Sequence, residues 1–285
     1  MWLRLAALKY AQIKKIRLSD EYLQEKIATT DETEVLMVLK NIAHQTSQTL
    51  FNPSVIKIQS EKVEFAKLYI RYCKGEDSAS LLPDLAKFFN SNVIEQRQVF
   101  PLLFSVAEQK QIAQWIPKIL ETSLSDRLKI FAIAIAGLTE NIPTLIQYMN
   151  STEFAPLAAE ALSMITGVNI DDEDLSLLEV EFEDEEKQQE YEELAEETFH
   201  QRYNRDNQTQ SYELDLPYPD IEKVKTWWQQ QQANYQTDTR YLAGKKLDQT
   251  GLEYVFNYGN QQQRKYATLH LKRLNPNIPM QSIRE

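Results

Sequence analysis

The 285-residue chain contains little cysteine, glycine or histidine, and each shortage argues against a class of function. Its one cysteine, Cys73, cannot form a disulfide within the chain, which argues against a small cross-linked secreted domain. The six glycines are scattered, whereas loops that bind phosphates need several close together. The three histidines, His44, His200 and His270, lie far apart, which argues against a zinc site. No Gly-x-Ser-x-Gly turn occurs. We therefore predict no catalytic residue, metal or cofactor.

Long apolar runs are also missing. The longest uninterrupted one, residues 131–138, is far shorter than the ~20 residues that a bilayer-spanning helix needs. Arg4 and Lys9 interrupt the apolar N-terminus, whereas a signal peptide carries its charges before the apolar region. We expect a cytoplasmic protein whose first segment is a repeat helix; a helix lying on a membrane surface is the less favoured alternative.

The net charge of −11 is concentrated in one segment. Residues 171–197 hold fifteen acidic side chains and one base, Lys187, so they carry −14 and the rest of the chain carries +3. Such a segment repels nucleic-acid phosphates and attracts basic surfaces. A solvated acidic surface is the simplest interpretation, and a docking surface for a basic partner is the functional one.

Calcium binding is a third interpretation of the acidic segment. Counting from Asp172, Asp174, Ser176 and Glu183 follow the order of EF-hand ligands. Leu177, however, stands where the calcium loop needs a glycine. We therefore expect no calcium site.

Apolar residues recur at helical spacing through most of the chain. One stripe steps by four and three residues through Leu124, Leu128, Phe131, Ile135 and Leu138. Similar stripes precede and follow it, whereas no long stretch alternates with the period of a strand.

Polar residues between the stripes predict where helices begin. Ser123 before Asp126 and Thr152 before Glu153 are expected to cap helices, and Asn141 precedes a helix that begins near Pro143.

Short helices joined by short turns, with a weak repeat of about 30 residues between Gly137 and Gly167, are typical of a helical solenoid. We predict an all-α fold, an α-solenoid of HEAT-like helical hairpins with an acidic insertion and a helical C-terminal region. The predicted divisions are residues 1–168 for the repeats, 169–213 for the acidic, partly helical segment, and 214–285 for a C-terminal helical region packed on the solenoid.

Several local patterns over about residues 95–275 resemble an uncharacterised bacterial family of HEAT-repeat proteins. They are Leu162–Val168 before an acidic stretch, Leu216–Asp220, Lys223-Val224, Trp227-Trp228, Arg240–Gly244, Leu247, and Gln262, Arg264 and Ala267.

Family members tend to be encoded beside type VI secretion genes. The resemblance therefore implies a toxin or secretion component as the partner, with the chain acting as an immunity protein or an effector adaptor. The family has a longer N-terminal part, so a leading segment is expected to be missing. The resemblance offers no catalytic residue to carry over.

The predicted function is non-enzymatic protein binding. Trp228 is included as an interface anchor, although packing of one tryptophan of the Trp227-Trp228 pair in the core is the more common arrangement. Basic residues of the C-terminal region, among them Arg240 and Arg273, are expected to pair with the acidic segment. The alternatives are a nucleic-acid-modifying enzyme of the glycosylase type and a structural homo-oligomer. The candidate partner-binding residues are Asp171, Asp172, Asp174, Glu181, Glu183, Asp184, Glu185, Glu186 and Trp228.

Overall fold

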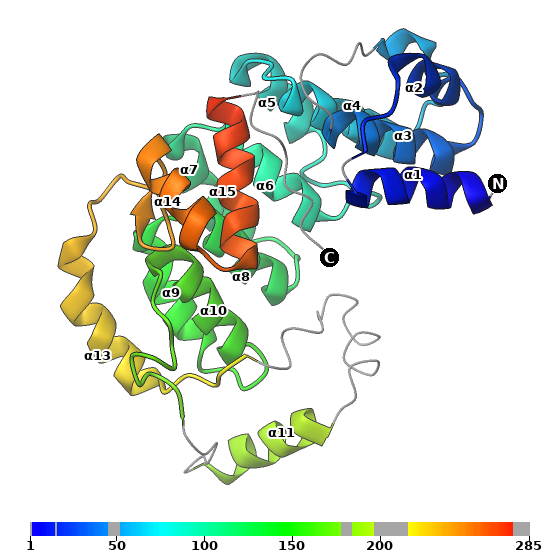
Figure 1. Ribbon diagram of the computed structural model, residues 1–285. Helices are drawn as coiled ribbons and strands as arrows, with labels where there is room; N and C mark the ends of the chain where they lie inside the picture. Colours follow the sequence, from blue (N-terminus) through cyan, green and yellow to red (C-terminus); the bar gives the residue numbers. More distant parts are fainter. Residues whose placement is uncertain (1, 15, 45–51, 178–183, 197–215, 276–285) are drawn as a thin grey trace. The chain divides into compact units, whose positions relative to one another are not determined.

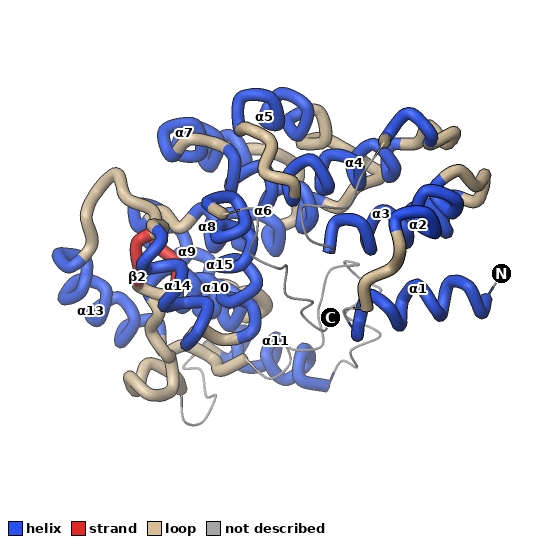
Figure 2. Tube along the Cα trace, turned by 45° about the horizontal axis from the view of Figure 1, so that its top comes forward, coloured by secondary structure: helices blue, strands red, loops and turns tan. Residues whose placement is uncertain are grey.

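The computed structural model describes residues 2–14, 16–44, 52–177, 184–196 and 216–275. Almost all of its regular structure is helical, which confirms the predicted all-α class (Figure 2). Within this part of the chain, no helix is both long and apolar enough to cross a bilayer.

The chain forms two compact units. One unit contains residues 1–108 and 248–285, and the other contains residues 109–247. Toward the C-terminus, the boundary between the two units falls after Leu247. Within the first unit, α15 (Gln261–Leu274) packs on α4 (Glu61–Cys73), where the Tyr72 hydroxyl donates to the Leu269 carbonyl at 2.6 Å.

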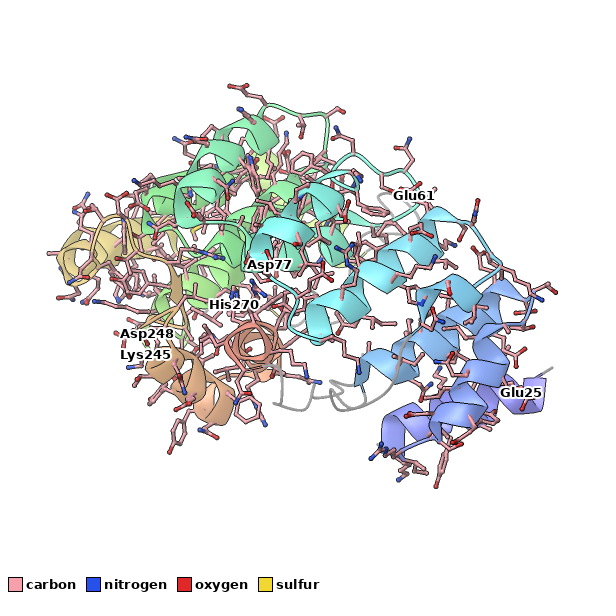
Figure 3. All side chains as sticks on the ribbon, turned by 90° about the horizontal axis from the view of Figure 1, so that it is seen from above. Glu25, Glu61, Asp77, Lys245, Asp248 and His270 are labelled. Carbon is pink, nitrogen blue, oxygen red and sulfur yellow. The ribbon has the colours of Figure 1, made fainter. Side chains whose placement is uncertain are left out.

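In the first unit, neighbours along the sequence pack on one another, α3 on α4, α4 on α5 and α5 on α6, and α15 packs on α4, α6 and α14 (Figure 1). Asp77 caps the start of α5 by accepting from the backbone of Ser80 (Figure 3). Cys73 is buried, as its helical position predicts. The helices are α1 (Trp2–Lys14), α2 (Asp20–Ile27), α3 (Glu32–His44), α4 (Glu61–Cys73), α5 (Ser78–Ala86), α6 (Gln96–Val106), α14 (Gln249–Tyr258) and α15 (Gln261–Leu274), with a 3-10 turn at Pro53–Val55.

In the second unit, α8 packs on α7, α9 and α10, and α13 packs on α9. This unit also contains two-residue strands that the sequence did not predict, paired antiparallel with Tyr241 opposite Lys246. Its elements are α7 (Gln109–Leu120), α8 (Asp126–Ala136), α9 (Ile142–Tyr148), α10 (Ala155–Thr166), α11 (Glu185–Glu196), α13 (Ile221–Gln231), β1 (Tyr241–Leu242) and β2 (Lys245–Lys246), with 3-10 turns at Thr139–Asn141 and Gln232–Asn234.

The predicted helix starts are partly right. Asn141 precedes α9, which carries Pro143 in its first turn, as expected. The residue before α8 is Ser125 rather than Ser123, and its side chain makes no cap hydrogen bond. Thr152 does not cap α10, because its buried hydroxyl makes no hydrogen bond and the helix begins three residues later.

The β1–β2 hairpin closes the C-terminal ends of α8 and α10. Gly137 and Gly167 end these helices in the left-handed conformation, which glycine adopts readily. The Tyr241 amide donates to the Gly137 carbonyl at 2.7 Å, and the Ala243 amide donates to the Met164 carbonyl at 2.7 Å. The hairpin thus binds carbonyls that a helix end leaves without intrahelical partners.

Candidate partner-binding surface

Helix α11 is the longest described part of the acidic segment. Asp184 stands just before it, and its carboxylate accepts from the Glu186 amide at 3.0 Å. Within the helix, the Gln189 side chain donates to the Glu193 carboxylate at 2.9 Å, one turn away. These local bonds favour the helix despite the repulsion between its many carboxylates.

The two sides of α11 differ in charge. Lys187, Gln188 and Tyr191, spaced like one helical face, are half-buried. The remaining described side chains of the helix are exposed, and all but Gln189 are carboxylates. These exposed acids, which we call the α11 acidic face, are Glu185, Glu186, Glu190, Glu192 and Glu193.

The chain enters and leaves the α11 region at neighbouring points. The Leu177 amide donates to the Tyr218 carbonyl at 2.9 Å, and the Asp220 amide donates to the Leu175 carbonyl at 2.7 Å. Ser176 and Pro219 form an antiparallel bridge between these bonds. We call this paired element the neck.

Tyr218 contacts both α11 and the body of its unit. Its ring meets that of Tyr191 edge to face, with ring centroids 5.5 Å apart, and its hydroxyl donates to the Thr152 carbonyl at 3.4 Å. Burial raises the pKa of the Tyr218 hydroxyl to about 12, and the nearby charge of Glu190 acts in the same direction. The phenol therefore stays protonated at neutral pH.

The acidic residues before the neck lie in an exposed loop. Asp172 accepts from the Asn169 side-chain amide at 2.6 Å. Asp174 has a left-handed backbone conformation, with φ of 53°, and forms an ion pair of 3.2 Å with Lys223 of α13. Part of the negative charge of this loop is thus balanced within the unit.

The predicted partner-binding residues have different positions. Asp171, Asp172, Asp174, Asp184, Glu185 and Glu186 are all exposed. Glu181 and Glu183 lie outside the described residues.

Trp228 is buried. Only 8% of it is exposed, and its ring packs against Tyr235 with centroids 5.6 Å apart. Tyr235 in turn meets Tyr241 of the hairpin. Trp227 is more accessible, so the structure places Trp228 in the core and leaves it little surface to offer a partner.

Two of the basic residues expected to pair with the acidic segment donate to backbone carbonyls. The Arg240 guanidinium donates to the Ala136 and Ile135 carbonyls at 2.8 and 3.1 Å, where a cation is favourable at the end of α8. Burial lowers the pKa of Arg240 to about 10. Arg273 donates to the Glu76 carbonyl at 2.5 Å.

In the described ranges, no group of three or more His, Cys, Asp or Glu side chains is placed to hold a metal ion. The EF-hand pattern includes Glu183, which lies outside those ranges.

No direct signal in the sequence marked the contacts of Tyr191 with Tyr218 and of Lys223 with Asp174. The nearest signal for the first was the Pro-Tyr-Pro connector, which places an aromatic residue between two prolines. Comparison with protein-family models, curated proteins and solved structures found no match.

Proposed function

We propose that the chain is a non-enzymatic binding protein whose α11 acidic face recognises a basic surface on another protein. The observation that carries this proposal is the sidedness of α11. Its one base, Lys187, lies on the half-buried side, and five carboxylates point outward. A concentrated field of one sign raises association rates with an oppositely charged partner and repels nucleic acid.

The helical units would act as the scaffold that carries this face. We propose that their hairpins form a HEAT-like solenoid, because consecutive helices pack on one another within each unit. A cytoplasmic location agrees with the lack of a membrane-spanning helix among the described residues.

The resemblance of residues 95–275 to proteins encoded near type VI secretion genes suggests the identity of the partner. We propose a basic toxin or effector, with the chain serving as an immunity protein or as an adaptor. The two roles share one kind of interaction, a large surface guided by charge.

Affinity purification from the native organism tests the proposal. The test variant neutralises one stripe of the α11 acidic face through Glu186→Gln, Glu190→Gln and Glu193→Gln. A matched control neutralises three exposed glutamates elsewhere; they are Glu95, Glu121 and Glu253. A basic protein recovered with wild type and control, and lost with the test variant, is expected. Equal recovery with both variants would contradict the proposal.

Co-expression with a toxin encoded beside the gene separates the two roles. Rescue of growth by wild type and by the control variant, but not by the test variant, is expected of an immunity protein. Unchanged toxicity together with a stable complex supports an adaptor. Binding to DNA at low salt would instead favour the enzyme alternative.

A further inference from the structure

The neck makes the α11 region a side branch of its unit. The Leu177 amide and the Tyr218 carbonyl are joined at 2.9 Å, and the Asp220 amide and the Leu175 carbonyl at 2.7 Å. A segment whose two ends are hydrogen-bonded to each other can turn about that point unless something beyond the neck fixes it. Among the described residues, the contacts of the helix with the body of its unit therefore bear directly on the orientation of α11.

Tyr218 belongs to the neck and also touches α11. Its backbone carbonyl closes the neck, its hydroxyl donates to the Thr152 carbonyl at 3.4 Å, and its ring meets Tyr191 at an interplanar angle of 85°. Edge-to-face contact is a preferred arrangement of two aromatic rings. One side chain thus links the body of the unit, the neck and the helix.

The side of α11 that meets Tyr218 determines which side faces outward. Tyr191 lies on the same half-buried face as Lys187 and Gln188. Residues two positions away on a helix point nearly opposite, so Glu193 and Gln189 face away from the contact. Holding Tyr191 therefore turns the carboxylates toward solvent.

We propose that Tyr218 is a positioning residue that presents the α11 acidic face to a partner by holding Tyr191. This inference rests on the proposed function of that face. Without the ring contact, α11 keeps its charge but samples many orientations about the neck. A partner with a defined basic surface then has to select one of them, which weakens binding.

Distance measurement between two spin labels tests the contact between Tyr191 and Tyr218, which we call the joint, without any partner. Gln189→Cys on α11 and Gln147→Cys on α9 provide exposed attachment sites within one unit. Cys73 is buried, and burial raises the pKa of its thiol to about 12, so it reacts slowly with the label. Pulsed electron paramagnetic resonance then reports the distribution of distances between the labels.

A narrow distribution is expected for the labelled parent protein. Tyr191→Ala should broaden it by about twofold or more, because the helix loses a tertiary contact. Tyr191→Phe keeps the ring and should restore the narrow distribution. Tyr254→Ala, at an exposed tyrosine of the other unit, should leave the distance distribution unchanged. Circular dichroism confirms that each variant stays helical.

If the distance distribution of Tyr191→Ala is as narrow as that of the parent, the proposal that Tyr218 positions α11 is wrong. The proposed function fails differently, through equal recovery of a basic partner by the two charge variants described above. Suppose that Tyr191→Ala broadens the distance distribution but no basic partner depends on the α11 carboxylates. The contact then fixes the position of α11, and its proposed role in recognition is wrong.

Discussion

Gly167 shows why one of the six glycines of the chain occupies its position. It ends α10 with φ of +76°, a conformation that side chains disfavour. A Cβ atom there would lie 2.6 Å from the Ala243 carbonyl oxygen, in the hairpin that closes the helix. A close backbone contact thus explains the glycine that follows Thr166.

Gly167→Ala is therefore expected to destabilise the protein by about 2–4 kcal/mol, from backbone strain and overpacking together. Gly251→Ala is the matched control, because Gly251 lies inside α14 at negative φ, where alanine should stabilise by about 0.5–1 kcal/mol. Thermal unfolding followed by circular dichroism measures both. Similar melting temperatures for the two variants would refute the explanation.

Glu160 on α10 gives a pH-dependent prediction. Burial raises the pKa of its carboxyl above the ordinary value of 4.5. Between that value and the higher folded pKa, the folded state binds more protons than the unfolded state, so this group's contribution to stability falls as pH rises. Above the folded pKa, the folded state bears the full free-energy cost of keeping the ionised Glu160 carboxylate buried.

Glu160→Gln removes that cost. We expect the melting temperature to rise at pH 7, on the order of 2 °C, and the gain to shrink as pH falls toward 4. Melting curves across that range test the expectation, with Glu95→Gln at an exposed site as control. A gain that is the same at every pH would show that burial of the charge is not its cause.

At the scale of elements, the positions of the helices were predictable from the sequence, whereas the elements that pack against them were not. The N-cap of α13 at Asp220 and the end of α10 at Gly167 follow from local chemistry that a sequence displays. The β1–β2 hairpin was missed because each strand has two residues, too few to show a period. Its stability comes from the carbonyls of α8 and α10, which lie far away in the sequence.

Helix α13 illustrates the same limit. Two adjacent tryptophans on a helix point in different directions, so one was expected to be buried, yet the sequence does not say which. The structure buries Trp228 against Tyr235. For the acidic segment, composition predicted the charge, while the sidedness of α11 depends on the contact between Tyr191 and Tyr218.

Trp228→Ala should lower the free energy of unfolding by about 3–5 kcal/mol, as expected for removing a buried aromatic ring. Trp227→Ala, at the more accessible neighbour, should cost less than about 1.5 kcal/mol. Urea denaturation followed by far-UV circular dichroism compares the two. Equal costs would place both rings in equivalent surroundings and contradict the packing described here.

At the scale of the molecule, the chain combines two helical units with a side branch of concentrated charge. The division into units was not predictable from local patterns, because α15 joins helices nearly 200 residues earlier in the sequence. The hydroxyl of Tyr72 meets the Leu269 carbonyl across a separation of 197 residues. The uneven charge, by contrast, was visible from composition alone.

The most direct test of the account is binding of a lysine-rich peptide carrying a fluorophore, followed by fluorescence anisotropy at low and high salt. Removing three surface charges should weaken binding by about tenfold at low salt. We expect this loss for the variant at Glu186, Glu190 and Glu193, and a much smaller one for the control at Glu95, Glu121 and Glu253. High salt should abolish the difference. Equal affinities for the two variants at low salt would contradict the claim that α11 recognises basic surfaces.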